Sequence, residues 1–149
     1  MIYGSVADAD AYFLTKRLDY QQVWAKESEA NKQIVLEMAT QAIERLNFLG
    51  EKADSTQELE FPRKDGSSVP EQIEHACYEC AYMFLDGVDP EFEGEMESAV
   101  SGQFGPVRER KAHDYTPQHR LHGIPSRTAW RLLSPFLDNN RSIILSRVN

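Results

Sequence analysis

The sequence lacks several features that would assign a protein to a class at once. No stretch approaches the run of about 18 apolar residues that a transmembrane helix needs. The first ten residues have neither the basic nor the apolar part of a signal peptide. Only two cysteines are present, Cys77 and Cys80, too few for a small secreted domain built on disulfides. These absences predict a protein of a reducing, intracellular setting with no membrane partner.

The residue sets that are typical of enzymes are missing as well. The sequence shows no nucleophile–base set, no glycine-rich phosphate loop and no complete group of metal ligands. Cys77 and Cys80 form a CxxC without a second ligand pair, so we expect both to pack in a core. His119 and His122 likewise have no neighbouring ligands to complete a metal site. We therefore expect a structural or binding protein that is not an enzyme and uses no cofactor.

Basic residues are scarce in the first two thirds of the chain. Residues 1–100 hold eight Lys and Arg against 21 Asp and Glu, a net charge of −13. Residues 101–149 hold eight against three, a net charge of +5. This split indicates that the two parts face different surroundings. An acidic solvated surface with scattered arginines would give the same totals.

The strongest helical pattern covers residues 28–50. Two apolar stripes, spaced by three and four residues, form a wide arc, and Ser28 and Gly50 suit its two ends. A helix with two apolar stripes contacts more than one neighbour. We expect it to be the centre of a bundle, with Met38 in a core that also holds Trp24 and Trp130.

Three further helices are predicted around this central one. Ser5 can cap a short N-terminal helix. Pro70 suits the start of a helix that runs to about Asp86. Ser126 can cap the last helix, which Pro135 should end.

The predicted fold class is mainly α, a small bundle of about four helices that spans residues 1–138 as one domain. An extended arm or β-hairpin is expected near residues 97–123, because Arg108 and Arg110 alternate with other side chains between glycines. Residues 139–149, NNRSIILSRVN, follow as an extended C-terminal tail.

The helix after Pro70 carries more apolar surface than its main core face requires. Tyr78, Tyr82 and Leu85 form a second stripe, spaced by four and three residues. Such a stripe has to be covered, and we expect a neighbouring subunit to cover it.

The order of these features resembles a known family. YGSVADADAYF, Trp24, the central helix, LEFPR, VPEQIEHACYECAY, GPVRERK and a short last helix with an internal Ser-Pro follow one another. They look like the head–tail connector (adaptor, or head-completion) proteins of tailed bacteriophages. Related sequences are often labelled DnaT-like single-stranded-DNA-binding proteins. The resemblance covers nearly the whole chain, although Phe61 stands where we would expect tryptophan.

The resemblance implies a structural virion protein. Connectors of this kind form a ring, usually of twelve copies, below the portal protein of the capsid. Neck or tail-completion proteins dock beneath the ring, and genomic double-stranded DNA passes through it. The protein would assemble in the host cytoplasm and reside at the head–tail interface of the virion. On this chain the subunit interface would be Tyr78, Tyr82 and Leu85, and the contact with DNA or a neighbouring ring would be Arg108, Arg110 and Lys111.

The C-terminal tail is the segment predicted to dock on the portal. Its apolar residues have high β-propensity, and strand addition to a partner would cover them. The residues assigned to this docking are Arg141, Ile143, Ile144, Leu145, Arg147 and Val148. The alternative is that the tail folds back on its own subunit.

A free single-stranded-DNA-binding protein is the competing function. Such proteins typically combine a basic groove with exposed aromatic side chains on which bases stack. The net charge of −8 favours the connector over this alternative.

Overall fold

The computed structural model describes residues 1–90 and 117–138, and over these residues the fold is mainly α. Extended pairing in these ranges is limited to isolated β-bridges between Phe48 and Leu137 and between Lys52 and Arg63. Six α-helices and one 3₁₀ helix are present there: α1 (Val6–Lys16), α2 (Tyr20–Val23), α3 (Glu29–Glu44), α4 (Glu71–Leu85), α7 (Gln118–Leu121), α8 (Arg127–Leu133) and the 3₁₀ helix η1 (Ser134–Phe136).

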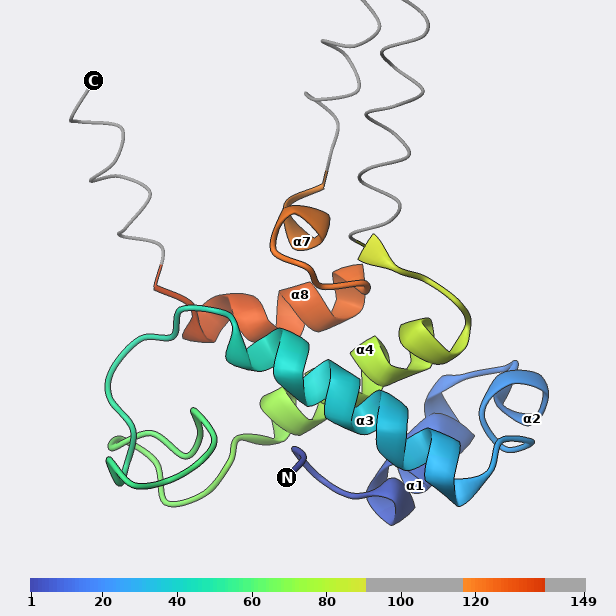
Figure 1. The fold of residues 1–149 in the computed structure, drawn as a ribbon, viewed down its shortest axis with the longest axis horizontal. Coiled ribbons are helices and arrows are strands. Elements are labelled where there is room, and N and C mark those ends of the chain that lie inside the picture. Colours follow the sequence, from blue (N-terminus) through green and yellow to red (C-terminus); the bar gives the residue numbers. More distant parts are fainter. Residues whose placement is uncertain (91–116, 139–149) are drawn as a thin grey trace, which may run out of the picture.

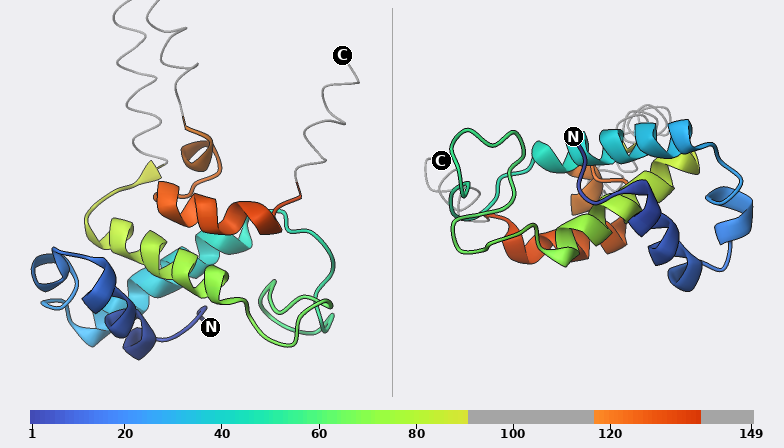
Figure 2. Two further views of the ribbon diagram at one scale, coloured as in Figure 1. Left: turned by 180° about the vertical axis from the view of Figure 1, so that it is seen from behind. Right: turned by 90° about the horizontal axis from the view of Figure 1, so that it is seen from below.

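Helix α4 lies between α3 and α8 and contacts both, while α1 packs on α3 and α4 (Figure 1). The loop between α3 and α4 lies at the same end of the bundle as η1, and α2 lies at the opposite end (Figure 2). The prediction of about four main helices is therefore confirmed in α1, α3, α4 and α8. No helix within the described ranges is long and apolar enough to cross a membrane.

The predicted helix starts are confirmed where a serine provides the cap. The side chains of Ser5, Ser28 and Ser126 each accept a hydrogen bond from the amide three residues later, at 3.1, 3.2 and 3.1 Å. This bond satisfies one of the amides that a helix leaves free at its first turn. At the other end of α8, Pro135 lies in η1, so the regular helix stops before it as expected.

Helix α3 is shorter than the apolar pattern predicts. It ends at Glu44, because the next residues pair with the C-terminal part of the bundle. The Leu49 amide donates to the Phe136 carbonyl at 2.8 Å, and the Asp138 amide donates to the Asn47 carbonyl at 2.9 Å. The prediction that the helix continues to residue 50 is therefore wrong.

Aromatic side chains dominate the core where α1, α3 and α4 meet. Trp24 is fully buried. Its ring centroid lies 4.6 Å from that of Phe13 and 6.4 Å from that of Tyr82. Its Nε1 donates to an Asp10 carboxylate oxygen at 2.6 Å. Met38, in contrast, is 44% exposed, so the prediction that it lies in the core is wrong.

The second stripe of α4 is covered by the chain itself, which corrects the subunit-interface prediction. Tyr78 and Tyr82 are each 2% exposed, and Leu85 is partly buried against the same core. The segment from α1 to α2 covers this face: the Tyr82 hydroxyl donates to Asp19 at 2.5 Å, and the Arg17 guanidinium lies 4.5 Å from the centroid of the Tyr82 ring. Tyr78 and Tyr82 are core residues of one subunit.

The two cysteines are fully buried in α4, as the sequence predicts. The Cys77 thiol donates to the Leu36 carbonyl at 3.6 Å and lies 3.4 Å from the Thr40 hydroxyl. Desolvation raises the pKa of Cys77 to about 12 and that of Cys80 well above its usual value. Both side chains therefore remain neutral thiols at physiological pH.

Part of the predicted arm is instead helical. Residues 117–123 form α7 and the turn after it, and His119 is buried against the bundle. The expectation of an arm is wrong for these residues, while residues 97–116 lie outside the described part of the chain.

Candidate nucleic-acid interface

Most of the contact residues predicted from the sequence cannot be placed in the structure. Arg108, Arg110 and Lys111 lie outside the described residues. The same holds for the predicted docking residues of the tail, which are Arg141, Ile143, Ile144, Leu145, Arg147 and Val148. A candidate site therefore has to be built from residues 1–90 and 117–138.

The two described ranges differ in net charge. Residues 1–90 hold eight Lys and Arg against 17 Asp and Glu, a net charge of −9. Residues 117–138 hold three Arg against one Asp, a net charge of +2. A polyanion would therefore be repelled by the surface of the first range and attracted to α7 and α8.

Helix α8 carries basic and aromatic side chains on one face. Arg127, Trp130 and Arg131 follow the i, i+3, i+4 spacing that places residues side by side on a helix. Both arginines are exposed, and Trp130 is half-buried. Neither arginine has an ion-pair partner within the residues that the structure describes.

His122 completes this surface by stacking on Trp130. The two ring centroids are 5.2 Å apart and the ring planes differ by 10°. His122 is itself exposed. We refer to His122, Arg127, Trp130 and Arg131 as the α8 patch.

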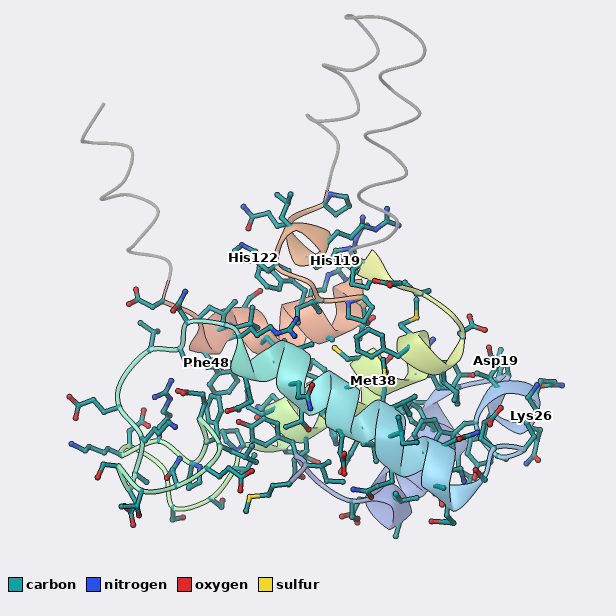
Figure 3. All side chains as sticks on the ribbon, in the orientation of Figure 1. Asp19, Lys26, Met38, Phe48, His119 and His122 are labelled. Atoms are coloured by element: carbon teal, nitrogen blue, oxygen red, sulfur yellow. The ribbon has the colours of Figure 1, made fainter. Side chains whose placement is uncertain are left out.

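The turn after α7 holds His122 in place. Gly123 has a φ of +76°, which a residue with a Cβ rarely adopts. The Ile124 amide donates to the His119 carbonyl at 2.8 Å, and His119 Nδ1 lies 2.8 Å from the Ile124 carbonyl oxygen. That carbonyl requires a donor, so His119 carries its proton on Nδ1. Figure 3 shows both histidines where α7 approaches α8.

The α8 patch combines the two interactions that single-stranded nucleic acid needs. An aromatic surface stacks with a base, at about 1–3 kcal/mol per base. A guanidinium binds phosphate oxygens through paired N–H donors. In the core of the bundle the same residue types are not available, because Trp24 is buried and the Arg17 guanidinium is paired with Glu79.

A second cluster of charged groups, between α1 and α4, is structural. The carboxylate of Glu79, which is 4% exposed, accepts a hydrogen bond from the Tyr12 hydroxyl at 2.8 Å and pairs with Arg17. Burial and the nearby carboxylate raise the pKa of Tyr12. In the described residues no group of three or more His, Cys, Asp and Glu is arranged to hold a metal ion.

Sequence reasoning missed the α8 patch because it treated Trp130 as core. The signal was present in the RxxWR spacing of residues 127–131, which places two cations beside one aromatic ring. What the sequence does not show is that the turn after α7 stacks His122 on that ring.

Comparison with known proteins identifies a family. Neither the curated proteins nor the solved structures gave a match. The family model described as "Putative DnaT-like ssDNA binding protein" matches residues 2–146. Since this match covers nearly all of the 149 residues, the chain belongs to this family of DnaT-like ssDNA-binding proteins.

Proposed function

We propose that the protein binds single-stranded DNA through the α8 patch. The observation that carries this proposal is the stack of His122 on Trp130 beside two exposed arginines. Membership of a family whose description names single-stranded-DNA binding supports it.

Each residue of the patch has a distinct role in this proposal. A base of the DNA stacks on the aromatic surface that His122 and Trp130 present. Arg127 and Arg131 are one helical turn apart, about 6 Å along the axis, and contact phosphates on either side of that base. The bases of a duplex already stack on one another, so their faces are not available. The patch therefore favours single strands over duplexes.

The acidic surface of residues 1–90 restricts where on the protein DNA can bind in this proposal. With a net charge of −9 it repels the phosphate backbone. DNA is thereby confined to the basic region around α7 and α8. This arrangement accounts for how a chain of net charge −8 could still bind a polyanion.

Fluorescence anisotropy with a labelled oligonucleotide, single-stranded and as a duplex, tests this proposal over a range of salt concentrations. The double variant Arg127→Gln/Arg131→Gln should bind the single strand more weakly. When the logarithm of its binding constant is plotted against the logarithm of the salt concentration, the slope should be shallower by about 0.7 for each phosphate that the variant no longer neutralises. Lys26→Gln, which removes an exposed cation near α2 (Figure 3), is the matched control and should bind as the wild type does.

Trp130→Ala should weaken binding further, by the energy of about one stacked base, 1–3 kcal/mol. The proposal is wrong if the arginine variant and the wild type bind alike. It is also wrong if duplex and single strand bind with equal affinity, because only a single strand offers a free base to the patch.

A head–tail connector of tailed bacteriophages is the second candidate. The specific observation in its favour is the acidic surface of residues 1–90, along which packaged DNA could move without adhering. In this function a ring, twelve copies by the resemblance, lies between the portal protein and a neck or tail-completion protein. The ring surrounds genomic double-stranded DNA at the head–tail interface of the virion. Neither candidate function requires catalysis.

Electron microscopy and light scattering of the purified protein, alone and with a portal protein, distinguish the two candidates. A ring that associates with the portal supports the connector. Binding of single-stranded DNA without a ring supports the first proposal. Because Tyr78 and Tyr82 are buried in the subunit, a ring would have to use another surface.

A further inference from the structure

A cavity of about 350 Å³ lies at the end of the bundle opposite to α2, where η1 meets the loop after α3. The α8 patch lies near the start of α8, and the cavity lies beside η1, which follows the end of that helix. Five apolar side chains contribute to its walls: Leu49, Phe61, Pro70, Pro135 and Phe136. Leu49 is 48% exposed, so the cavity presents a large aliphatic side chain that the described residues leave uncovered.

Arg63 gives the same cavity a polar wall. The residue is 9% exposed, and its guanidinium lies 5.5 Å from the ring centroids of both Phe48 and Phe61. One of its terminal nitrogens pairs with Glu60 at 3.0 Å. Its Nε–H is buried and has no acceptor among the described residues. A buried donor without a partner is unfavourable, so Arg63 is held in this wall by its ion pair and its ring contacts.

The described chain ends beside this cavity. Phe136, which forms part of the wall, is held by the Leu49 amide, and Asp138 is held by the Asn47 carbonyl. The apolar residues 143–145 begin five positions after Asp138. Five extended residues span about 17 Å, so this run can return to the cavity without any rearrangement of the bundle.

We propose that residues 143–145 of the C-terminal tail occupy this cavity, beside Arg63, in their own subunit. Their Ile-Ile-Leu side chains cover Leu49 and Phe136, which removes apolar surface from water on both sides. Charge also matches: the tail carries Arg141 and Arg147 and no acidic side chain, and Asp65 at the cavity is exposed.

This inference is independent of DNA binding and changes the expected role of the tail. A tail that is seated in its own subunit is not displayed for strand addition to a portal. A partner that uses residues 143–145 would first have to displace them from the cavity.

Thiol labelling of the full-length protein tests the proposal. Leu49→Cys places a reactive group in the cavity, and the two native cysteines are fully buried and give only background labelling. The variant Leu49→Cys/Ile144→Asp should react with a maleimide about tenfold faster than Leu49→Cys/Ser142→Asp, because only the first disrupts the apolar run and opens the site. Ile34→Cys, on the exposed face of α3, should react at one rate in both tail backgrounds.

Thermal unfolding of every variant checks that the bundle is intact. Equal labelling rates of the Ile144→Asp and Ser142→Asp variants would overturn the proposal. Protection of the residue 49 thiol that disappears on dilution would also overturn it, since the occupant would then be the tail of a second copy. Protection that is independent of protein concentration and sensitive to Ile144→Asp supports the seated tail.

Discussion

The two described ranges use the same kinds of side chain in opposite ways. In residues 1–90, Trp24 is fully buried and its Nε1 is bonded to Asp10. In residues 117–138, Trp130 is half-buried and stacks on the exposed His122. Arg17 is paired with a buried carboxylate, whereas Arg127 has no such partner in the described residues.

This difference separates stability from recognition. A fully buried aromatic contributes its whole apolar area to folding and cannot meet a ligand. A half-buried one contributes less to folding and retains a surface for binding. The predictions below test this division, because each change in residues 1–90 should chiefly affect stability.

Trp24→Ala should have the largest effect. Its removal leaves a cavity next to Phe13 and Tyr82 and deprives Asp10 of a donor, so the free energy of unfolding should fall by about 3–5 kcal/mol. Urea denaturation measures this. Trp130→Ala should cost less, since part of that side chain is already in water. Equal losses for the two variants would show that Trp24 and Trp130 contribute equally to stability.

Gly4→Ala should be next in size. Gly4 has a φ of +78°, and a Cβ there would lie 2.0 Å from the Tyr78 hydroxyl oxygen. Backbone strain and overpacking together should cost about 2–4 kcal/mol. Gly50 has the same φ but open space around it, so Gly50→Ala isolates the strain. The smaller loss, about 1–2 kcal/mol, should appear in the same denaturation experiment. If Gly50→Ala lost as much stability as Gly4→Ala, Tyr78 would not pack against Gly4.

Arg17→Gln should cost about 2 kcal/mol. It leaves the carboxylate of the buried Glu79 with the Tyr12 hydroxyl as its partner from α1. Losing one partner of a buried pair can cost about 3–5 kcal/mol, and the 28% exposure of the Arg17 side chain reduces that figure through solvent screening. Arg127→Gln should change the unfolding free energy by no more than about 0.5 kcal/mol. If the two variants are equally stable, the ion pair between α1 and α4 does not contribute to folding.

Local features of the fold could be predicted from the sequence, and the features that depend on tertiary approach could not. Ser5, Ser28 and Ser126 cap their helices because a cap needs only the residue and the next turn. The sequence predicts the second apolar stripe of α4, but not which part of the chain covers that stripe. Which element covers Tyr78 and Tyr82 depends on the path of α1 and α2 around the bundle.

The same limit applies to the candidate site. The pattern of residues 127–131 specifies one face of a helix, but the exposure of Trp130 depends on how closely α7 approaches. His122 precedes the first residue of α8 and joins the patch through the turn at Gly123. A helical repeat carries no information about a contact with a residue outside the helix.

The smallest expected effect is a loss of stability at alkaline pH that originates in residues 1–90. Burial raises the pKa of Cys77 to about 12 in the folded protein, whereas an unfolded thiol has a pKa near 8.5–9. The unfolded chain therefore releases the thiol proton first as the pH rises. The stabilising contribution is complete below about pH 8 and is lost progressively between about pH 9 and 12.

At about pH 9.5 the contribution of Cys77 to this loss should be about 1 kcal/mol. Cys80 shifts in the same direction, so the double variant Cys77→Ala/Cys80→Ala should flatten the dependence of unfolding free energy on pH between about 8 and 9.5. The absolute stability of this variant will differ, but the slope reports the titration alone. Residues 117–138 contain neither cysteine nor tyrosine and contribute nothing to this slope. A wild-type slope that the double variant leaves unchanged would mean that the thiols are not the groups that titrate, and that the alkaline sensitivity of the core comes from its tyrosines.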